Sequence, residues 1–353
     1  MRASDRMTQL PSSNGGSLPD ALARTRSAIQ PAMEHAVRRM NPDIARMASY
    51  HLGWTDTDGR PLDAPGGKLV RPALALLSAA AAWAEPEIGV PGGVAVELVH
   101  NYSLIHDDII DGDTERHHRP TVWSVFGIGP AIIAGDALAV AAQQVLLECE
   151  AHGSAAAELL ADATAAMIAG QADDIAFERQ STVSVDDCVA MCAAKTGALL
   201  GAAASIGAVL AGAPPATIGA LRDYGGHLGL AFQAVDDLLG IWGNPARTGK
   251  PAGNDLRRRK KSLPVVAALA AGGDESDELR ALVVGTPGAP VLDEAQVTRA
   301  AYLVEACGGR EWARTRAKSH LDGALGALER VRLSPVPHRT LADLAAFVVD
   351  RES

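Results

Sequence analysis

The sequence has 353 residues, of which 48% are hydrophobic and only 4% aromatic, and its formal net charge is −10. This charge and the scattered basic residues argue against a nucleic-acid binder, because affinity for the phosphate backbone comes from clustered lysines and arginines. Four cysteines in a chain of this length do not form a disulfide framework. The many helix-forming residues, alanine and leucine above all, favour an all-α fold.

Two regions are expected along the chain. Residues 1–18 contain Ser, Asn, Gly and Pro without periodicity, which predicts a disordered N-terminal tail. Residues 19–353 contain no linker or internal repeat that would divide them, so we expect one large helical domain. No signal peptide is recognisable, and we expect no apolar run long and clean enough to cross a membrane. A cytoplasmic protein is therefore expected.

Apolar residues at helical spacing predict a series of helices. They are expected, in chain order, at 19–37, 44–52, from 72 onward, through 97–111, at 131–150, 155–174 and 185–210, from 216 through 240, and at 264–271, 293–307, 310–331 and 337–349. The stretch 272–291 is rich in Gly, Pro and acidic residues, which predicts a loop. The last three helices carry no recognisable chemistry, so we interpret them as scaffold.

The motif Asp107-Asp108-x-x-Asp111 ends an apolar helical run. On a helix, Asp107 and Asp111 stand one turn apart on the same face, with Asp108 about 100° away around the axis. These carboxylates repel one another, and they lie at the end of the helix that is unfavourable for negative charge. A hard cation such as Mg²⁺ would explain the cluster. The alternative is a solvated acidic helix end.

A second acidic pair, Asp236-Asp237, follows another apolar run. If the two helices face each other antiparallel in a bundle, their carboxylates meet across a cavity. Metal ions held in this way would bind a diphosphate. A second pair in a matching context favours the metal site over two solvated helix ends.

Basic residues suggest anion sites near these acids. The loop Gly66-Gly67-Lys68-x-x-Arg71 leads into a helix N-terminus, which together with two cations can bind an anion, although such loops also occur in ordinary turns. Arg116 follows the first acidic motif and is placed to reach a bound diphosphate. Lys195, among Ala, Leu and Gly, must either extend to solvent or face an anion. The run 257–261 is expected to be mostly solvated surface.

In this order, the motifs resemble those of the trans-isoprenyl diphosphate synthase family, also called polyprenyl synthetases, over residues 21–349. The blocks that carry the resemblance are Gly66-Gly67-Lys68-x-x-Arg71-Pro72, Asp107-Asp108-x-x-Asp111, Lys195-Thr196, Phe232-Gln233-x-x-Asp236-Asp237, and finally Lys250, Asp255 and Lys260. The resemblance implies an all-α bundle around a central cavity, usually homodimeric. It implies head-to-tail condensation of isopentenyl diphosphate with an allylic diphosphate.

The resemblance also implies roles for individual residues. Three Mg²⁺ ions are expected on Asp107, Asp111 and Asp236, with Asp108 and Asp237 in support. The allylic diphosphate is expected to lie among Lys195, Thr196, Gln233, Lys250 and Arg116, with Lys260 completing the substrate-binding cations. Isopentenyl diphosphate, held without metal, is expected at Lys68, Arg71 and His100.

Three departures from the family pattern stand out in the sequence. Gly240 replaces the usual fifth-position Asp of the second motif, which predicts weakened metal binding. His117 replaces the second of two adjacent arginines. Arg259 stands where the family has a glycine.

Product length is expected to depend on Tyr102. Five residues before Asp107, it lies ~7.5 Å further along the helix axis, where the growing hydrocarbon must pass. With the small Ser103 beside it, the resemblance implies a medium-length product. We expect C20 geranylgeranyl diphosphate first and C15 farnesyl diphosphate second. The alternative is that Tyr102 only fills the core.

A terpene cyclase and a non-catalytic partner subunit are the two alternative functions. A terpene cyclase on the same scaffold also ionises a prenyl diphosphate, but it has no use for a second anion site at Lys68, Arg71 and His100. A non-catalytic partner subunit would have no need to keep the first Asp triplet intact.

Overall fold

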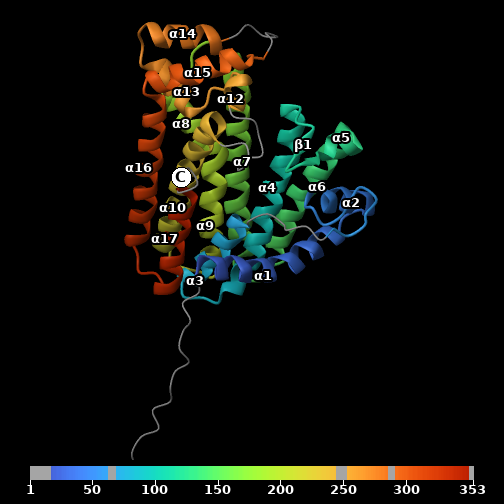
Figure 1. Cartoon of the computed structure of the whole chain (residues 1–353). Helices are drawn as coiled ribbons and strands as arrows, with labels where there is room; N and C mark the ends of the chain where they lie inside the picture. Colours follow the sequence, from blue (N-terminus) through green and yellow to red (C-terminus); the bar gives the residue numbers. More distant parts are fainter. Residues whose placement is uncertain (1–16, 63–68, 244–252, 285–290, 350–353) are drawn as a thin grey trace, which may run out of the picture.

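The computed structural model describes residues 17–62, 69–243, 253–284 and 291–349 (Figure 1). The helices are α1 (Leu18–Arg38), α2 (Pro42–His51), α3 (Val70–Ala81), η1 (Pro86–Gly89), α4 (Val90–Asp111), α5 (Val122–Phe126), α6 (Ile128–Leu147), α7 (Gly153–Arg179), α8 (Val185–Cys192), η2 (Ala193–Gly197), α9 (Ala198–Leu210), α10 (Pro215–Trp242), α12 (Asn254–Arg257), α13 (Leu263–Ala270), α14 (Asp274–Val283), α15 (Glu294–Ala306), α16 (Gly309–Glu329) and α17 (Pro335–Val349). Across these described ranges the only sheet is a hairpin of β1 (Glu115–Arg116) and β2 (Arg119–Pro120). The all-α prediction is confirmed.

Helix α9 is the centre of the bundle. Every residue from Leu199 to Leu210 is buried, and the helix packs against α3, α7 and α10. A helix that is apolar on all sides is stable only inside other helices. Glycines allow the close approach: a Cβ on Gly207 would overlap the backbone of Ala75 in α3, and one on Gly225 of α10 would overlap the carbonyl of Leu200.

The helices of the two acidic motifs, α4 and α10, end on the same side of the bundle (Figure 1). The end of α10 is joined to α12 by a hydrogen bond from Gly253 N to Ile241 O. Just after α12, Arg258 donates to the carbonyl of Asp111, at the end of α4, with an N–O distance of 2.7 Å. The two helices therefore run in the same direction and do not meet the antiparallel condition considered in the sequence analysis. Because both motifs lie near C-terminal ends, they meet only when the helices run in the same direction.

Other boundaries also differ from the prediction. The expected loop 272–291 contains helix α14, whose first turn carries three acidic residues that favour the helix dipole and whose Leu279 and Val283 are buried. Helix α1 begins at Leu18, capped by Ser17 and Asp20, so the expected tail ends at least one residue earlier. The rest of that tail, 1–16, lies outside the described residues.

Helix α7 is longer than expected at its C-terminal end. It continues to Arg179 and does not end near Asp174. Gly153 is its first residue, and a Cβ there would overlap the carbonyl of Leu146. The extension places Asp174 within a rigid helix, and this position matters for the site.

Two helical stretches in the described part of the chain are long and apolar enough to span a membrane, which corrects the expectation that none is. One is Val185–Leu210, with 61% of its most apolar window buried, and the other is α6, with 39% buried. The first owes its hydropathy to its place inside the bundle. The second has an exposed apolar side that includes Ile133, Val140 and Leu147.

Candidate active site

The two aspartate pairs are each divided between a buried and a more exposed residue. Asp108 is buried, and its Oδ1 accepts a hydrogen bond from Arg116 Nε at 2.9 Å. Asp237 is also buried, and it accepts bonds from Gln233 Nε2 and from the backbone N–H of Leu263, both at 2.8 Å. Because the second residue of each pair is bound to the protein, the first remains available to a ligand.

Burial changes the proton affinity of these acids. Burial raises the pKa of Asp107 to about 6, while nearby Lys195 opposes the shift and Asp111 adds to it. Burial likewise raises the pKa of Asp237 to about 7, against the opposing charge of Lys260. Carboxylates held in this way are costly to ionise without a cation, and a divalent cation would displace their protons.

A further acid of the site, Asp174 of α7, was not recognised from the sequence. Its Oδ2 lies 2.5 Å from Lys195 Nζ, so Lys195 faces an anion, one of its two expected alternatives. Its charge also acts on Asp107 and on Lys260, which places Asp174 near both acidic motifs. The only signal was an acidic pair within a helical pattern, and nothing in its spacing marked it as functional.

Lys195 and Thr196 lie in η2, a π-helical turn in the middle of the predicted 185–210 helix. Such turns are frequent at functional sites. The backbone of Lys195 lies so close to α7 that a Cβ on Gly170 would overlap it. Thr196 Oγ1 donates to Gln233 Oε1 at 2.8 Å, which links η2 to the Gln233–Asp237 pair.

The expectation that the run 257–261 is mostly solvated surface is wrong, because Arg258 alone among these five residues is exposed. Its side chains bind the following partners: Arg257 to Glu294, Arg258 to Asp113, Arg259 to the carbonyl of Leu282, and Lys261 to the carbonyl of Phe177. Burial lowers the pKa of Lys260, but four carboxylates, beginning with Asp255 and Asp237, outweigh it and hold that pKa well above its usual range. The prediction failed because the sequence did not show how many acids converge here.

Beside the acidic motifs lies a cavity of about 710 Å³. One wall has Arg71 from α3, His100 from α4 and Arg116 from β1, with the acid Glu97 of α4 beside Arg71. Leu228 and Phe232 of α10 form part of the apolar lining. Burial lowers the pKa of Arg71, and the Nε of Arg71 is buried without a hydrogen-bond partner. The cavity is therefore suited to an anion with a hydrocarbon tail. Lys68 and Lys250 lie outside the described residues.

The donor atoms fit Mg²⁺ only together with further ligands. Within the described ranges, no three His, Cys, Asp or Glu side chains converge closely enough to hold a metal ion. Two buried acceptor atoms, Asp108 Oδ2 and Gln171 Oε1, have no hydrogen-bond partner. An all-oxygen donor set suits Mg²⁺, which usually takes one or two carboxylates and completes its shell with water and phosphate oxygens.

The chain matches the polyprenyl synthetase family over residues 60–295. It belongs to this family. It is 44% identical over 351 residues to a (2E,6E)-farnesyl diphosphate synthase of Mycobacterium tuberculosis, covering 99% of this chain and 96% of that protein. It is also 44% identical over 316 residues to a geranylgeranyl diphosphate synthase of that organism, covering 89% of each. A polyprenyl synthetase structure from Streptomyces coelicolor superposes with a TM-score of 0.90 at 49% identity, over 94% of this chain and 100% of that one. The expected enzyme class, a trans-prenyltransferase, is confirmed.

Two of the positions at which this chain departs from the family's sequence pattern have a structural explanation. A Cβ on Gly240 would overlap the carboxylate of Asp255, so a carboxylate already lies beside the position where the expected Asp is missing. Arg259 has φ of 55°, the left-handed conformation that glycine adopts most easily. The arginine therefore keeps the backbone shape for which the family uses glycine.

Tyr102 lies at the contact between α4 and α6. Its ring packs edge-on against His106, with centroids 4.9 Å apart, and His106 Nε2 donates to the carbonyl of Ile132 in α6 at 3.1 Å. Ser103 Oγ donates to the carbonyl of His100. Neither Tyr102 nor Ser103 lines the basic cavity. The role of these residues in product length stays a prediction.

We expect Gly240→Asp, which restores the usual motif, to lower turnover about tenfold or more and to reduce the melting temperature. The new side chain collides with Asp255 and adds a like charge. Gly219→Asp is the control, because it lies in the same helix with nothing within 4 Å of its Cβ. Steady-state kinetics and thermal unfolding measure both variants. A faster Gly240→Asp enzyme would show that Asp255 does not fill this space.

Proposed function

We propose that this enzyme condenses isopentenyl diphosphate head to tail with an allylic diphosphate and forms a medium-length all-trans prenyl diphosphate. One observation carries the proposal: two anion sites of different kinds lie side by side. The first has carboxylates with Lys195 and Lys260 among them, as a metal-bound diphosphate requires. The second has the basic wall of the cavity, with Arg71 and His100. A substrate pair with one metal-bound and one metal-free diphosphate matches both.

The chemistry follows from these positions. Mg²⁺ held by Asp107, Asp111 and Asp236 would neutralise the negative charge that develops on the departing diphosphate. The allylic C–O bond breaks, and the diphosphate leaves with its electron pair. The double bond of isopentenyl diphosphate then attacks the allylic carbon, and a proton is lost to the departing diphosphate. The apolar side chains of Leu228 and Phe232 keep water from the carbocation.

The second anion site also supports a synthase over the two alternatives. A terpene cyclase needs only one diphosphate site, and the buried, unpartnered Nε of Arg71 would have no use in it. A non-catalytic subunit has no reason to keep Asp107 at a position where burial disfavours its charge.

We expect Asp107→Ala and Asp236→Ala each to lower turnover by about three orders of magnitude or more, because each removes a ligand at the point where charge develops. Adding EDTA is expected to abolish activity, and Mg²⁺ to restore it. Asp223→Ala is the control, since this exposed acid of α10 pairs with Arg330 at the surface. Turnover is measured together with the thermal shift caused by Mg²⁺ and inorganic pyrophosphate. Near-normal values in both variants would refute the metal assignment.

We expect a C20 product, with C15 as the second expectation. Tyr102→Ala is expected to lengthen the product, because a ring five residues before Asp107 would lie in the path of the growing hydrocarbon, although it does not line the basic cavity. Tyr302→Ala, at an exposed tyrosine of α15, is the matched control. Products made from each allylic primer are sized by chromatography. An unchanged distribution from an active Tyr102→Ala enzyme would show that the ring only fills space.

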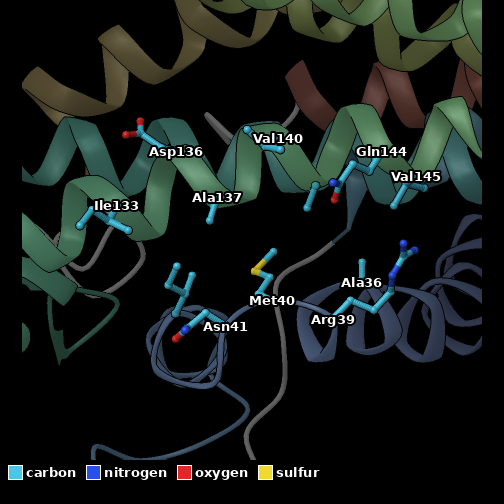
Figure 2. A pocket seen from close by; sticks show the side chains of 12 residues that line it. Ala36, Arg39, Met40, Asn41, Ile133, Asp136, Ala137, Val140, Gln144 and Val145 are labelled. Atoms are coloured by element: carbon cyan, nitrogen blue, oxygen red, sulfur yellow. The ribbon is translucent and has the colours of Figure 1, made fainter.

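We also propose that the enzyme is a homodimer and that a second copy covers α6. The exposed apolar residues Ile133, Val140 and Leu147 repeat every seven positions and form a stripe along this helix. A groove of about 410 Å³ lies between α6 and the α1–α2 corner (Figure 2). Ile133 and Val140 of α6 line this groove together with Met40 and Asn41. An exposed apolar stripe with seven-residue spacing is typical of a helix that packs against another helix.

We expect Val140→Glu to convert the dimer to monomer, because a charge in the centre of an apolar contact is costly to bury. Val291→Glu is the control, since Val291 is exposed outside the stripe. Sedimentation velocity gives the masses. A wild-type monomer, or a variant that stays dimeric, would contradict the assignment of α6.

A further inference from the structure

The hairpin after the first acidic motif places two arginines on one face. Arg116 in β1 and Arg119 in β2 are directly paired, and the two residues between them, His117 and His118, form the turn. Both turn residues have positive φ, 50° and 60°, as a two-residue type I′ turn requires. Directly paired residues of a hairpin project their side chains to the same side. Arg116 and Arg119 therefore both line the basic cavity.

Arg119 is held rigidly in this place. Its guanidinium stacks over the ring of Tyr50, with Cζ 4.5 Å from the centroid, and its Nη2 donates to the carbonyl of Thr55 at 3.0 Å. The ring is held in turn, because the Tyr50 hydroxyl donates to the carbonyl of Pro120 at 2.7 Å and the ring packs edge-on against Phe126. A preorganised arginine loses little entropy when it binds an anion.

The charges on this wall are only partly balanced within the described residues, where Glu97 faces Arg71. Like charges directly opposite each other on a hairpin are destabilising. Arg116 is compensated by Asp108 at 2.8 Å, but Arg119 has no carboxylate within ion-pair distance among the residues that the structure describes. An anion between the two guanidinium groups would remove this repulsion.

His51, the last residue of α2, lies on the same wall. Burial lowers the pKa of His51 to about 3, and the charges of Arg116 and Arg119 add to the shift. His51 is therefore within electrostatic reach of both arginines. A neutral imidazole has one N–H to donate, and the Asn101 side chain beside His51 competes with an anion for that N–H. His117, the residue that replaces the family's second arginine, is exposed in the turn.

We propose that Arg119 and His51 bind the diphosphate of isopentenyl diphosphate, extending the basic wall of the cavity from Arg116 toward α2. Arg119 then supplies, from the opposite strand, the second guanidinium that position 117 lacks. This inference rests on the proposed function, because it takes the cavity to be the metal-free diphosphate site.

The test is the binding of isopentenyl diphosphate to the full-length enzyme in EDTA, measured by calorimetry. Without metal, only the second anion site is occupied. Arg119→Gln keeps a donor for Thr55 but removes the charge, and it is expected to raise Kd about tenfold or more. His51→Gln is expected to raise Kd about threefold, and Arg119→Lys to fall between wild type and Arg119→Gln. Arg46→Gln is the matched control, because Arg46 of α2 stacks on Phe126 and does not line the cavity.

Steady-state kinetics separate binding from a purely structural role. In Arg119→Gln the KM for isopentenyl diphosphate is expected to rise while the KM for the allylic substrate is unchanged, and the melting temperature is expected to stay close to that of wild type. A Kd within twofold of wild type, or an equal rise in both KM values, would overturn the role of Arg119. If Arg119→Gln does not fold, His51→Gln and Arg119→Lys decide by the same criteria.

The same measurements distinguish a failure of the proposed function from a failure of this inference. Wild-type enzyme that does not bind isopentenyl diphosphate in EDTA overturns the assignment of the cavity, and the inference with it. Wild-type binding that is lost in Arg71→Gln but normal in Arg119→Gln and His51→Gln overturns the inference alone.

Discussion

The structure depends on holding many carboxylates together at one end of a helical bundle. Asp107 and Asp237 both lie where burial and a neighbouring acid oppose their charge. The protein offsets part of this cost with Lys195 and Lys260, each placed among several acids. The remaining imbalance favours the binding of cations, so the same electrostatics that cost stability prepare the site for Mg²⁺ and diphosphate.

Close helix packing makes this arrangement possible. The all-apolar helix α9 anchors α3, α7 and α10, and glycines let their backbones approach. At Gly170 the contact brings the π-helical turn of Lys195 against α7, next to Asp174. At Gly240 it brings the carboxylate of Asp255 against α10. Small residues thus position the charged ones, because a rigid contact fixes the geometry that a flexible side chain alone does not.

The two diphosphate sites differ in what opposes the negative charge. At the ends of α4 and α10, carboxylates dominate, and metal ions would offset their charge. In the neighbouring cavity, Arg71 and Arg119 would face the anion directly under the proposed assignment, and burial lowers the pKa of His51 and His100. Metal ions bound beside the acids alone would then distinguish two chemically similar diphosphates by position. The apolar surface between the sites leaves room for the hydrocarbon chains.

The sequence by itself determined the fold class, the two aspartate motifs and the family, because helical periodicity and motif spacing are local properties of the chain. It did not determine that α4 and α10 run in the same direction, that α7 extends beyond Asp174, or that the side chains of 257–261 bind acids and backbone carbonyls of distant segments. It also placed no weight on His51 or Arg119. These features depend on which residues meet across the bundle and the hairpin, and contacts between distant segments are set only when the tertiary structure forms.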